Sequence, residues 1–211
     1  MARKQSARST PQDPGPAIIA AAMRLAAERP WSEIPLADIA AAAGTTLIEL
    51  YRLFPSKPAI LTALARQADA AVLGQPVDLG DQPRDRLFDV LMHRFDTLRP
   101  SRPALKRIAG ELGRLRLDAL PALAALPRSM AWMLEAAGIP AAGLRGALRA
   151  RVLGAAYLSA FRAFLEDDSA DLARTMAALD RALRRAEPLL GLPGGAPEAP
   201  AAGPAAVPDE F

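Results

Sequence analysis

The chain has 211 residues, of which 51% are hydrophobic and only 5% aromatic, so wholesale disorder is excluded and a β-sandwich or barrel is disfavoured. It carries 26 Lys+Arg against 23 Asp+Glu, a formal charge of +3, with one His and no Cys. This composition excludes disulfides, thiol chemistry and most zinc or catalytic-triad sites, so we expect no cofactor, no metal ion and no enzymatic activity. No charge-free run of 18 residues and no signal-peptide pattern occur, which predicts a cytoplasmic chain without stable membrane insertion.

Apolar residues recur at helical spacing between prolines, and no segment alternates as a strand does. The sequence therefore predicts an all-α fold of about nine helices, with prolines such as Pro140 and Pro188 at helix boundaries. The expected helices cover residues 16–28, 36–43, 47–53, 57–73, 84–98, 104–115, 122–137, 141–165 and 170–186.

Composition also divides the chain into four parts. The first is basic and the last is rich in Gly, Pro and Ala, so both are predicted to be disordered. A connection rich in Gly, Pro and Asp after residue 73 separates two helical domains between them. The expected parts are a basic arm at 1–13, an N-terminal domain at 14–73, a larger helical domain at 74–190 and a tail at 191–211.

The segment 36–57 predicts a helix-turn-helix. Gly44 follows the apolar stripe of the first short helix, at a position suited to the left-handed turn that closes a helix. Thr46 and Glu49 have the spacing of a capping box, in which each side chain satisfies the other residue's backbone N–H. Two short helices joined in this way cross closely, and the second can enter the major groove of DNA.

The same segment resembles the N-terminal domain of the tetracycline-repressor (TetR) family, over about residues 17–73. The resemblance implies an all-α, dimeric, ligand-responsive transcriptional regulator, usually a repressor, whose C-terminal domain holds the ligand pocket and the dimer interface. The residues that carry it are Asp38-Ile39-Ala40, Ala43-Gly44, Thr46, Leu50-Tyr51, Phe54 and Ser56-Lys57, with Trp31 after the first helix.

Double-stranded DNA is therefore an expected partner, and six residues are expected to contact it. The resemblance implies that Tyr51 and Lys57 bind phosphates and that a threonine hydroxyl bonds the DNA backbone at the helix entry. Arg52 is an added phosphate candidate. The basic arm, with Arg3, Lys4 and Arg8, either enters the minor groove or is a solvated tail. The predicted DNA contacts are Thr45, Thr46, Leu47, Tyr51, Arg52 and Lys57.

The sequence departs from the family where bases should be read. Leu47, Ile48 and Glu49 stand where relatives usually carry polar or basic side chains. Apolar groups can contact thymine methyls, but purines are read by bidentate donors, which are absent here. Two interpretations of the second helix therefore stay open: it reads bases, or it is vestigial and does not read them.

The C-terminal half supports the second alternative. It is similar to the lipid-binding ubiquinone-biosynthesis protein that shares the TetR fold, in segments 133–139, 153–164 and 167–181. That similarity implies an isoprenoid lipid-binding accessory protein with a vestigial helix-turn-helix.

A ligand pocket for a small apolar or amphipathic effector is predicted in the C-terminal domain, although the same pattern also fits plain core. Positions 84–116 carry nine Lys+Arg against four acids. This run could hold a carboxylated ligand or an anionic lipid surface, or form a solvated helix face. The predicted pocket residues are Phe88, Met92, Phe95, Ile108, Met130, Met133, Tyr157 and Phe161.

The last two long helices carry more apolar surface than a single copy of the domain can bury, which favours a homodimer through a four-helix interface. Such a dimer would set two recognition helices about 34–36 Å apart on a palindromic site. Asp167 and its acidic neighbours precede the last helix, where acids are favoured, so we expect a helix start there. The predicted interface positions are Leu144, Leu148, Val152, Ala155, Ala156, Ser159, Ala160, Leu172, Met176, Leu179 and Leu183.

Overall fold

A computed structural model describes residues 13–76, 82–112 and 120–192. Every regular element among these residues is a helix, which confirms the predicted all-α class. The predicted basic arm and Gly/Pro/Ala tail fall outside the described residues, except for Asp13, Gly191 and Leu192. The α-helices are α1 (Gly15–Glu28), α2 (Leu36–Ala42), α3 (Leu47–Leu53), α4 (Lys57–Leu73), α5 (Pro83–Leu98), α6 (Arg102–Leu112), α7 (Leu120–Ala136), α8 (Gly143–Leu165) and α9 (Ala173–Leu190).

Most helix ends lie within a few residues of their predicted positions, and those of α3 and α4 agree with the prediction residue for residue. Two short 3₁₀ helices, Trp31–Glu33 and Arg99–Ser101, were not predicted. The expectation of a boundary at Pro188 is wrong, because α9 continues through it to Leu190. In the last turn the missing N–H of proline removes a single bond to Arg184, and the helix closes at Gly191 with φ of 63°.

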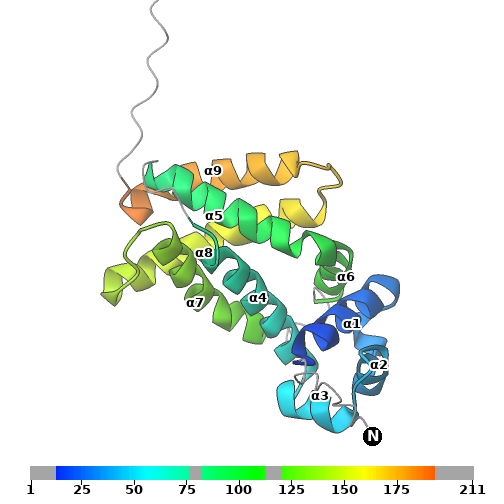
Figure 1. Ribbon diagram of the computed structural model, residues 1–211. Coiled ribbons are helices and arrows are strands. Elements are labelled where there is room, and N and C mark those ends of the chain that lie inside the picture. The colour runs from blue at the N-terminus through cyan, green and yellow to red at the C-terminus, as the bar shows by residue number, and fades with distance from the viewer. Residues whose placement is uncertain (1–12, 77–81, 113–119, 193–211) are drawn as a thin grey trace, which may run out of the picture.

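The helices form a small N-terminal unit and a larger bundle (Figure 1). The unit is made of α1, α2 and α3, and α4 runs from it into the bundle, where it packs against α5 and α7. In the bundle α8 packs along α9, while α6 lies across α1 and so joins the two parts. Because α4 and α6 both cross from one part to the other, the N-terminal unit is held by two separate connections.

The N-terminal unit closes over a core of its own. Ile18 and Ala22 of α1, Ile39 of α2 and Leu50 of α3 are fully buried together. Arg29 pairs with Asp38, and the guanidinium of Arg24 donates to the carbonyl oxygen of Ala42 at 3.1 Å, so polar contacts also tie α1 to α2.

The larger core is centred on aromatic rings from α5 and α8. Phe95 stacks on Tyr157 with 5.0 Å between ring centroids and tilts against Phe164 at 5.1 Å. Phe161 completes the cluster, 5.8 Å from both Tyr157 and Phe164. Offset and tilted pairs of this kind add to the free energy gained by burial alone.

The start of α9 is built on one buried carboxylate. Asp167 is completely buried and accepts hydrogen bonds from the backbone and hydroxyl groups of both Ser169 and Thr175. Although burial by itself raises the pKa of Asp167, the hydrogen bonds from Ser169 and Thr175 outweigh it and lower the pKa to about 2. The acidic stretch therefore precedes a helix start, as predicted, and α9 begins at Ala173.

Candidate DNA-binding site and ligand cavity

The turn between α2 and α3 depends on one glycine. Gly44 adopts the left-handed conformation, with φ of 67°, and the next N–H, that of Thr45, donates to the carbonyl oxygen of Ala40 at 3.0 Å. Glycine takes this conformation without the steric cost that a Cβ imposes. The turn reverses the chain sharply enough for α3 to cross α2, which completes the predicted helix-turn-helix.

The predicted capping box at the start of α3 is present. The backbone N–H of Glu49 donates to the Thr46 hydroxyl at 3.3 Å, and Glu49 accepts from the N–H of Thr46 at 2.9 Å. The hydroxyls of Thr45 and Thr46 also donate to the same carboxylate oxygen, each at 2.8 Å. The N–H of Thr46 and the two hydroxyls lower the pKa of Glu49 to about 2. At neutral pH the carboxylate is thus ionised and engages both threonine hydroxyls.

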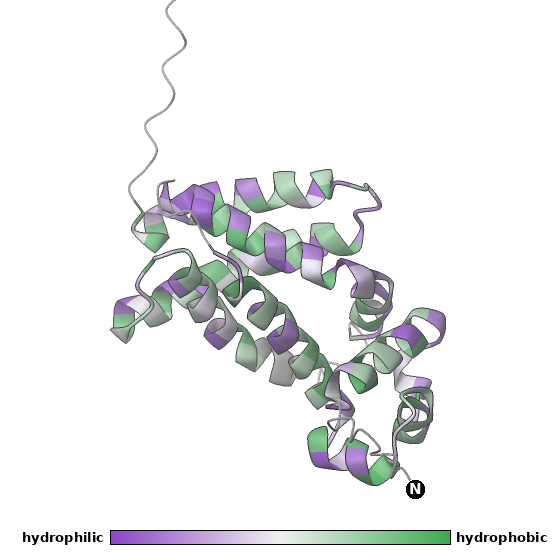
Figure 2. Cartoon of the chain, viewed as in Figure 1, coloured by the Kyte–Doolittle hydropathy of each residue, from purple (hydrophilic) through white to green (hydrophobic). Residues whose placement is uncertain are grey.

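The outer face of α3 is open to solvent and mainly apolar. Leu47 and Ile48 are each more than half exposed and Tyr51 is 64% exposed, whereas Leu50 on the opposite face is buried. The exposed side chains surround a shallow apolar hollow whose floor comes from Leu36 and other residues of α2 and α3. Hydrophobic residues along α3 stand out at the end of the molecule far from α9 (Figure 2).

Lys57 sits at the junction of the two parts. Its ammonium donates to the carbonyl oxygen of Trp31 and lies 4.8 Å from the centre of the indole ring. The carboxylate of Glu111 in α6 accepts hydrogen bonds from the backbone N–H groups of Trp31 at 2.7 Å and Ser32 at 2.9 Å. Burial raises the pKa of Glu111, but the N–H donors and the charge of Lys57 lower it overall. Lys57 thus holds Trp31 at the start of α4, and its contact with a phosphate stays a prediction.

The six predicted DNA contacts therefore fall into two groups. Thr45, Thr46, Leu47, Tyr51 and Arg52 lie together on α3 and its entry turn, and all but the half-buried Thr45 are exposed. Lys57 begins α4 and is half-buried. The N-terminal part thus presents one exposed helix, on which the polar side chains of Tyr51 and Arg52 lie beside apolar ones.

The eight predicted pocket residues do not line the cavity that the described residues form next to Arg94. Five of them, Phe95, Ile108, Met130, Met133 and Tyr157, are buried in the aromatic and aliphatic core, and Phe88, Met92 and Phe161 pack partly exposed against it. That cavity lies instead between α4 and α7, with Arg94 of α5 at its floor, and has a volume of about 460 Å³. It is lined by Thr62, Ala65, Arg66, Asp69, Ala70, Leu73, Arg94, Ala125, Leu126, Arg128, Ser129 and Trp132.

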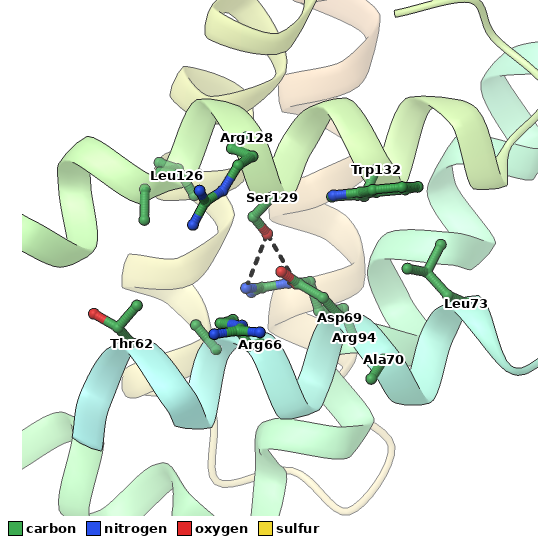
Figure 3. Close-up of a pocket in the computed structure, with 12 residues that line it drawn as sticks. Thr62, Arg66, Asp69, Ala70, Leu73, Arg94, Leu126, Arg128, Ser129 and Trp132 are labelled. Atoms are coloured by element: carbon green, nitrogen blue, oxygen red, sulfur yellow. Dashed lines mark hydrogen bonds and ion pairs between the residues drawn. The ribbon is translucent and has the colours of Figure 1, made fainter. Parts of the chain in front are cut away.

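A buried polar network forms the floor of this cavity (Figure 3). The guanidinium of Arg94, only 3% exposed, donates to Asp69 at 2.8 Å and to the hydroxyl of Tyr157. Ser129 donates to Asp69 at 2.8 Å. Burial by itself lowers the pKa of Arg94, whereas the neighbouring Tyr157 and Asp69 raise it above its ordinary value. Arg94 is therefore a buried cation whose charge Asp69 balances.

Sequence reasoning missed this network for a definable reason. Arg94 belongs to the basic run 84–116, which was read as one charged stretch, and Asp69 lies 25 residues earlier. A usable signal was present: Asp69 is the only acid in α4 and sits beside Ala68, among residues of the buried face. A lone carboxylate on such a face indicates a buried partner.

The α8–α9 surface only partly matches the predicted interface. Leu144 and Leu148 are 87% and 56% exposed, and Ala155 and Ser159 continue the exposed stripe along α8. Other predicted interface positions are already covered within the chain, since each is 7% exposed or less; they are Ala156, Ala160, Leu172, Leu179 and Leu183.

Fold and site together define a helix-turn-helix protein with a helical companion domain. Residues 18–64 match the family described as "Bacterial regulatory proteins, tetR family". Part of the N-terminal unit thus resembles the N-terminal segment of that family, and the described chain is similar in fold to solved TetR-family transcriptional regulators.

Two solved structures share this fold. A TetR transcriptional regulator from Nitrosomonas europaea is 27% identical, with a TM-score of 0.64 over 82% of this chain and 97% of that chain. One from Rhodococcus sp. RHA1 is 20% identical, with a TM-score of 0.61 over 82% of this chain and 94% of that one. Among curated proteins, none matches the sequence. Within the described residues, no helix is both long and apolar enough to cross a bilayer.

Proposed function

We propose that this protein is a ligand-responsive transcriptional repressor of the cytoplasm that binds a palindromic DNA site as a homodimer. The observation that carries the proposal is the outward face of α3, positioned by the Gly44 turn and by the Thr46–Glu49 capping box. A short helix held in this way and exposed along one side has the form of a recognition helix.

The exposed side chains of α3 are suited to two kinds of DNA contact. Tyr51 and Arg52 are exposed donors suited to phosphate oxygens, which position the protein without reading sequence. Leu47 and Ile48 can contact thymine methyl groups in the major groove. Glu49 opposes binding by its charge, so we expect modest affinity and a preference for sites rich in A·T pairs.

Homodimer formation is proposed through the exposed stripe of α8. Leu144 and Leu148 are large apolar side chains in solvent, and Ala155 and Ser159 are small enough for a partner helix to approach closely. A two-fold interface along this stripe of α8 would place two copies of α3 on the same side of the dimer.

DNA binding can be tested by electrophoretic mobility with the DNA upstream of the protein's own gene, at two salt concentrations. Tyr51→Phe should weaken binding to all sequences about threefold to tenfold, because one phosphate hydrogen bond is lost. Leu47→Ala should instead change the sequence preference. Arg174→Gln, an exposed change on α9, is the control. Binding that shows no sequence preference would contradict a regulatory role.

The apolar face of α3 also favours a second candidate function, an isoprenoid lipid-binding accessory protein whose helix-turn-helix no longer reads DNA. Leu47, Ile48 and Tyr51 form an exposed apolar surface that would also suit a protein or lipid partner. Mass spectrometry of the purified protein distinguishes the two functions. A co-purifying isoprenoid lipid together with no shift of DNA would favour this candidate, and a lipid-free protein that shifts a palindrome would exclude it.

A further inference from the structure

The cavity between α4 and α7 carries an excess of positive charge. Three guanidinium groups, those of Arg66, Arg94 and Arg128, line it against the one carboxylate of Asp69. Because Asp69 balances the buried Arg94, the charges of Arg66 and Arg128 are left over. Neither of these two arginines forms an ion pair with any residue in the described ranges 13–76, 82–112 and 120–192.

The two arginines come from opposite walls. Arg66 projects from α4 and Arg128 from α7, and both point into the space between these helices (Figure 3). Guanidinium groups bind carboxylates through paired, charge-assisted hydrogen bonds. An anion between the two walls would meet both.

Apart from Thr62 and Ser129, whose hydroxyls donate to the Pro58 carbonyl oxygen and to Asp69, the rest of the lining is apolar. Leu73 and Leu126 contribute aliphatic surface, and Trp132 lies at the rim with 54% of its surface exposed. A large indole in solvent beside a cationic cavity is a stacking or packing surface for an apolar group. The cavity thus combines an anion-binding part with an apolar part.

We infer that the α4–α7 cavity binds an amphipathic carboxylate, held by Arg66 and Arg128 through its anionic group and by Trp132, Leu73 and Leu126 through its apolar part. A role of this ligand as the effector rests on the proposed regulatory function, whereas its binding does not. The volume of about 460 Å³ suits a ligand of moderate size.

Tryptophan fluorescence provides a direct readout, because the chain has two Trp residues and only Trp132 is exposed, Trp31 being buried. The full-length protein would be titrated at pH 7 with decanoate, decanol and decyltrimethylammonium, which share one chain length and differ in charge. Decanoate should change the emission and saturate, decanol should bind at least about tenfold more weakly, and the cation should not bind. Trp132→Phe should remove the signal.

Variants at the two arginines then test the assignment. R66Q/R128Q should weaken decanoate binding at least about tenfold and leave decanol binding unchanged, while Arg151→Gln, an exposed change on α8, should have no effect. R66E/R128E should reverse the preference toward decyltrimethylammonium. Circular dichroism would confirm that each variant is folded. Equal affinity for decanoate and decanol, or an unchanged preference in R66Q/R128Q, would overturn the inference.

A separate DNA-binding assay distinguishes the two proposals. Decanoate should weaken DNA binding by the wild type but not by R66Q/R128Q. If decanoate binds as described and the protein binds no DNA, the result supports the carboxylate site and contradicts the regulatory function. If the protein binds a palindrome and shows no preference for the carboxylate, the result supports the regulatory function and contradicts the carboxylate site.

Discussion

Glu49 stabilises the start of α3 and at the same time opposes DNA binding. Its carboxylate accepts three hydrogen bonds from Thr45 and Thr46, which would otherwise be free to donate to a phosphate. Because its pKa is lowered to about 2, well below the ordinary value of 4.5, the contribution of this group to helix stability is complete above pH 4.5 and is lost as the pH falls through 2. The charge therefore persists at every pH at which DNA binding would be measured.

Glu49→Gln should accordingly tighten DNA binding about fivefold at low salt, since it removes one negative charge close to phosphates. Glutamine preserves the capping box, so the fold should be unchanged. Fluorescence anisotropy with a labelled duplex would measure the effect at two salt concentrations. Asp168→Asn, which removes an exposed carboxylate in the other domain, is the matched control. Weaker binding of Glu49→Gln would mean that the carboxylate itself takes part in recognition.

At the scale of single elements, the first turn of α9 is held by Asp167, which accepts from the backbone N–H and the hydroxyl of Thr175. Asp167→Asn should lower the free energy of unfolding by about 2 kcal/mol at pH 7, because hydrogen bonds to a buried charge are weakened or lost. The folded pKa of about 2 lies below the ordinary 3.8, so this stabilisation is complete above pH 3.8 and disappears as the pH falls through 2. Urea unfolding of both proteins between pH 7 and pH 2 would measure it. A difference that stays constant down to pH 2 would contradict the assignment.

Element boundaries were largely predictable because they depend on local chemistry. Gly44 and the Thr46–Glu49 pair fix the ends of α2 and α3 through interactions between residues close in sequence. The cavity between α4 and α7 was not predictable in the same way. Periodicity shows which face of a helix is buried, but not whether two buried faces leave a space between them. Arg94 illustrates the limit, since its burial depends on Asp69 and Tyr157, which come from other helices.

At the scale of the whole molecule, Leu148 tests the proposed dimer. Leu148→Glu should weaken self-association about 100-fold or more, because a carboxylate would be buried in an apolar interface. Sedimentation velocity over a range of concentrations would measure it. Leu53→Glu places the same change on α3, where a large apolar side chain is also exposed, and should leave the dimer intact. An unchanged dimer in Leu148→Glu would place the interface elsewhere.

The contact between α6 and the N-terminal unit can be tested through Glu111. Glu111→Gln should speed hydrogen exchange at the amides of Trp31 and Ser32 about tenfold or more, because the strong acceptor for both is weakened. Exchange at Leu50, in the core of the unit, should not change. Heteronuclear magnetic resonance would resolve these amides, and equal exchange in both proteins would show that the carboxylate does not hold this segment.

Helix α4 is long enough to connect the cavity to the helix-turn-helix end of the molecule. This helix has 17 residues and no proline or glycine beyond its first turn, so it behaves as a stiff rod of about 25 Å. Asp69 lies toward one end and Lys57, braced against Trp31, lies at the other. A ligand bound between α4 and α7 would tilt this helix. A tilt of a few degrees about its middle would move the far end sideways by roughly 0.5 to 1 Å. A displacement of this size would weaken the fit of α3 in the major groove of DNA.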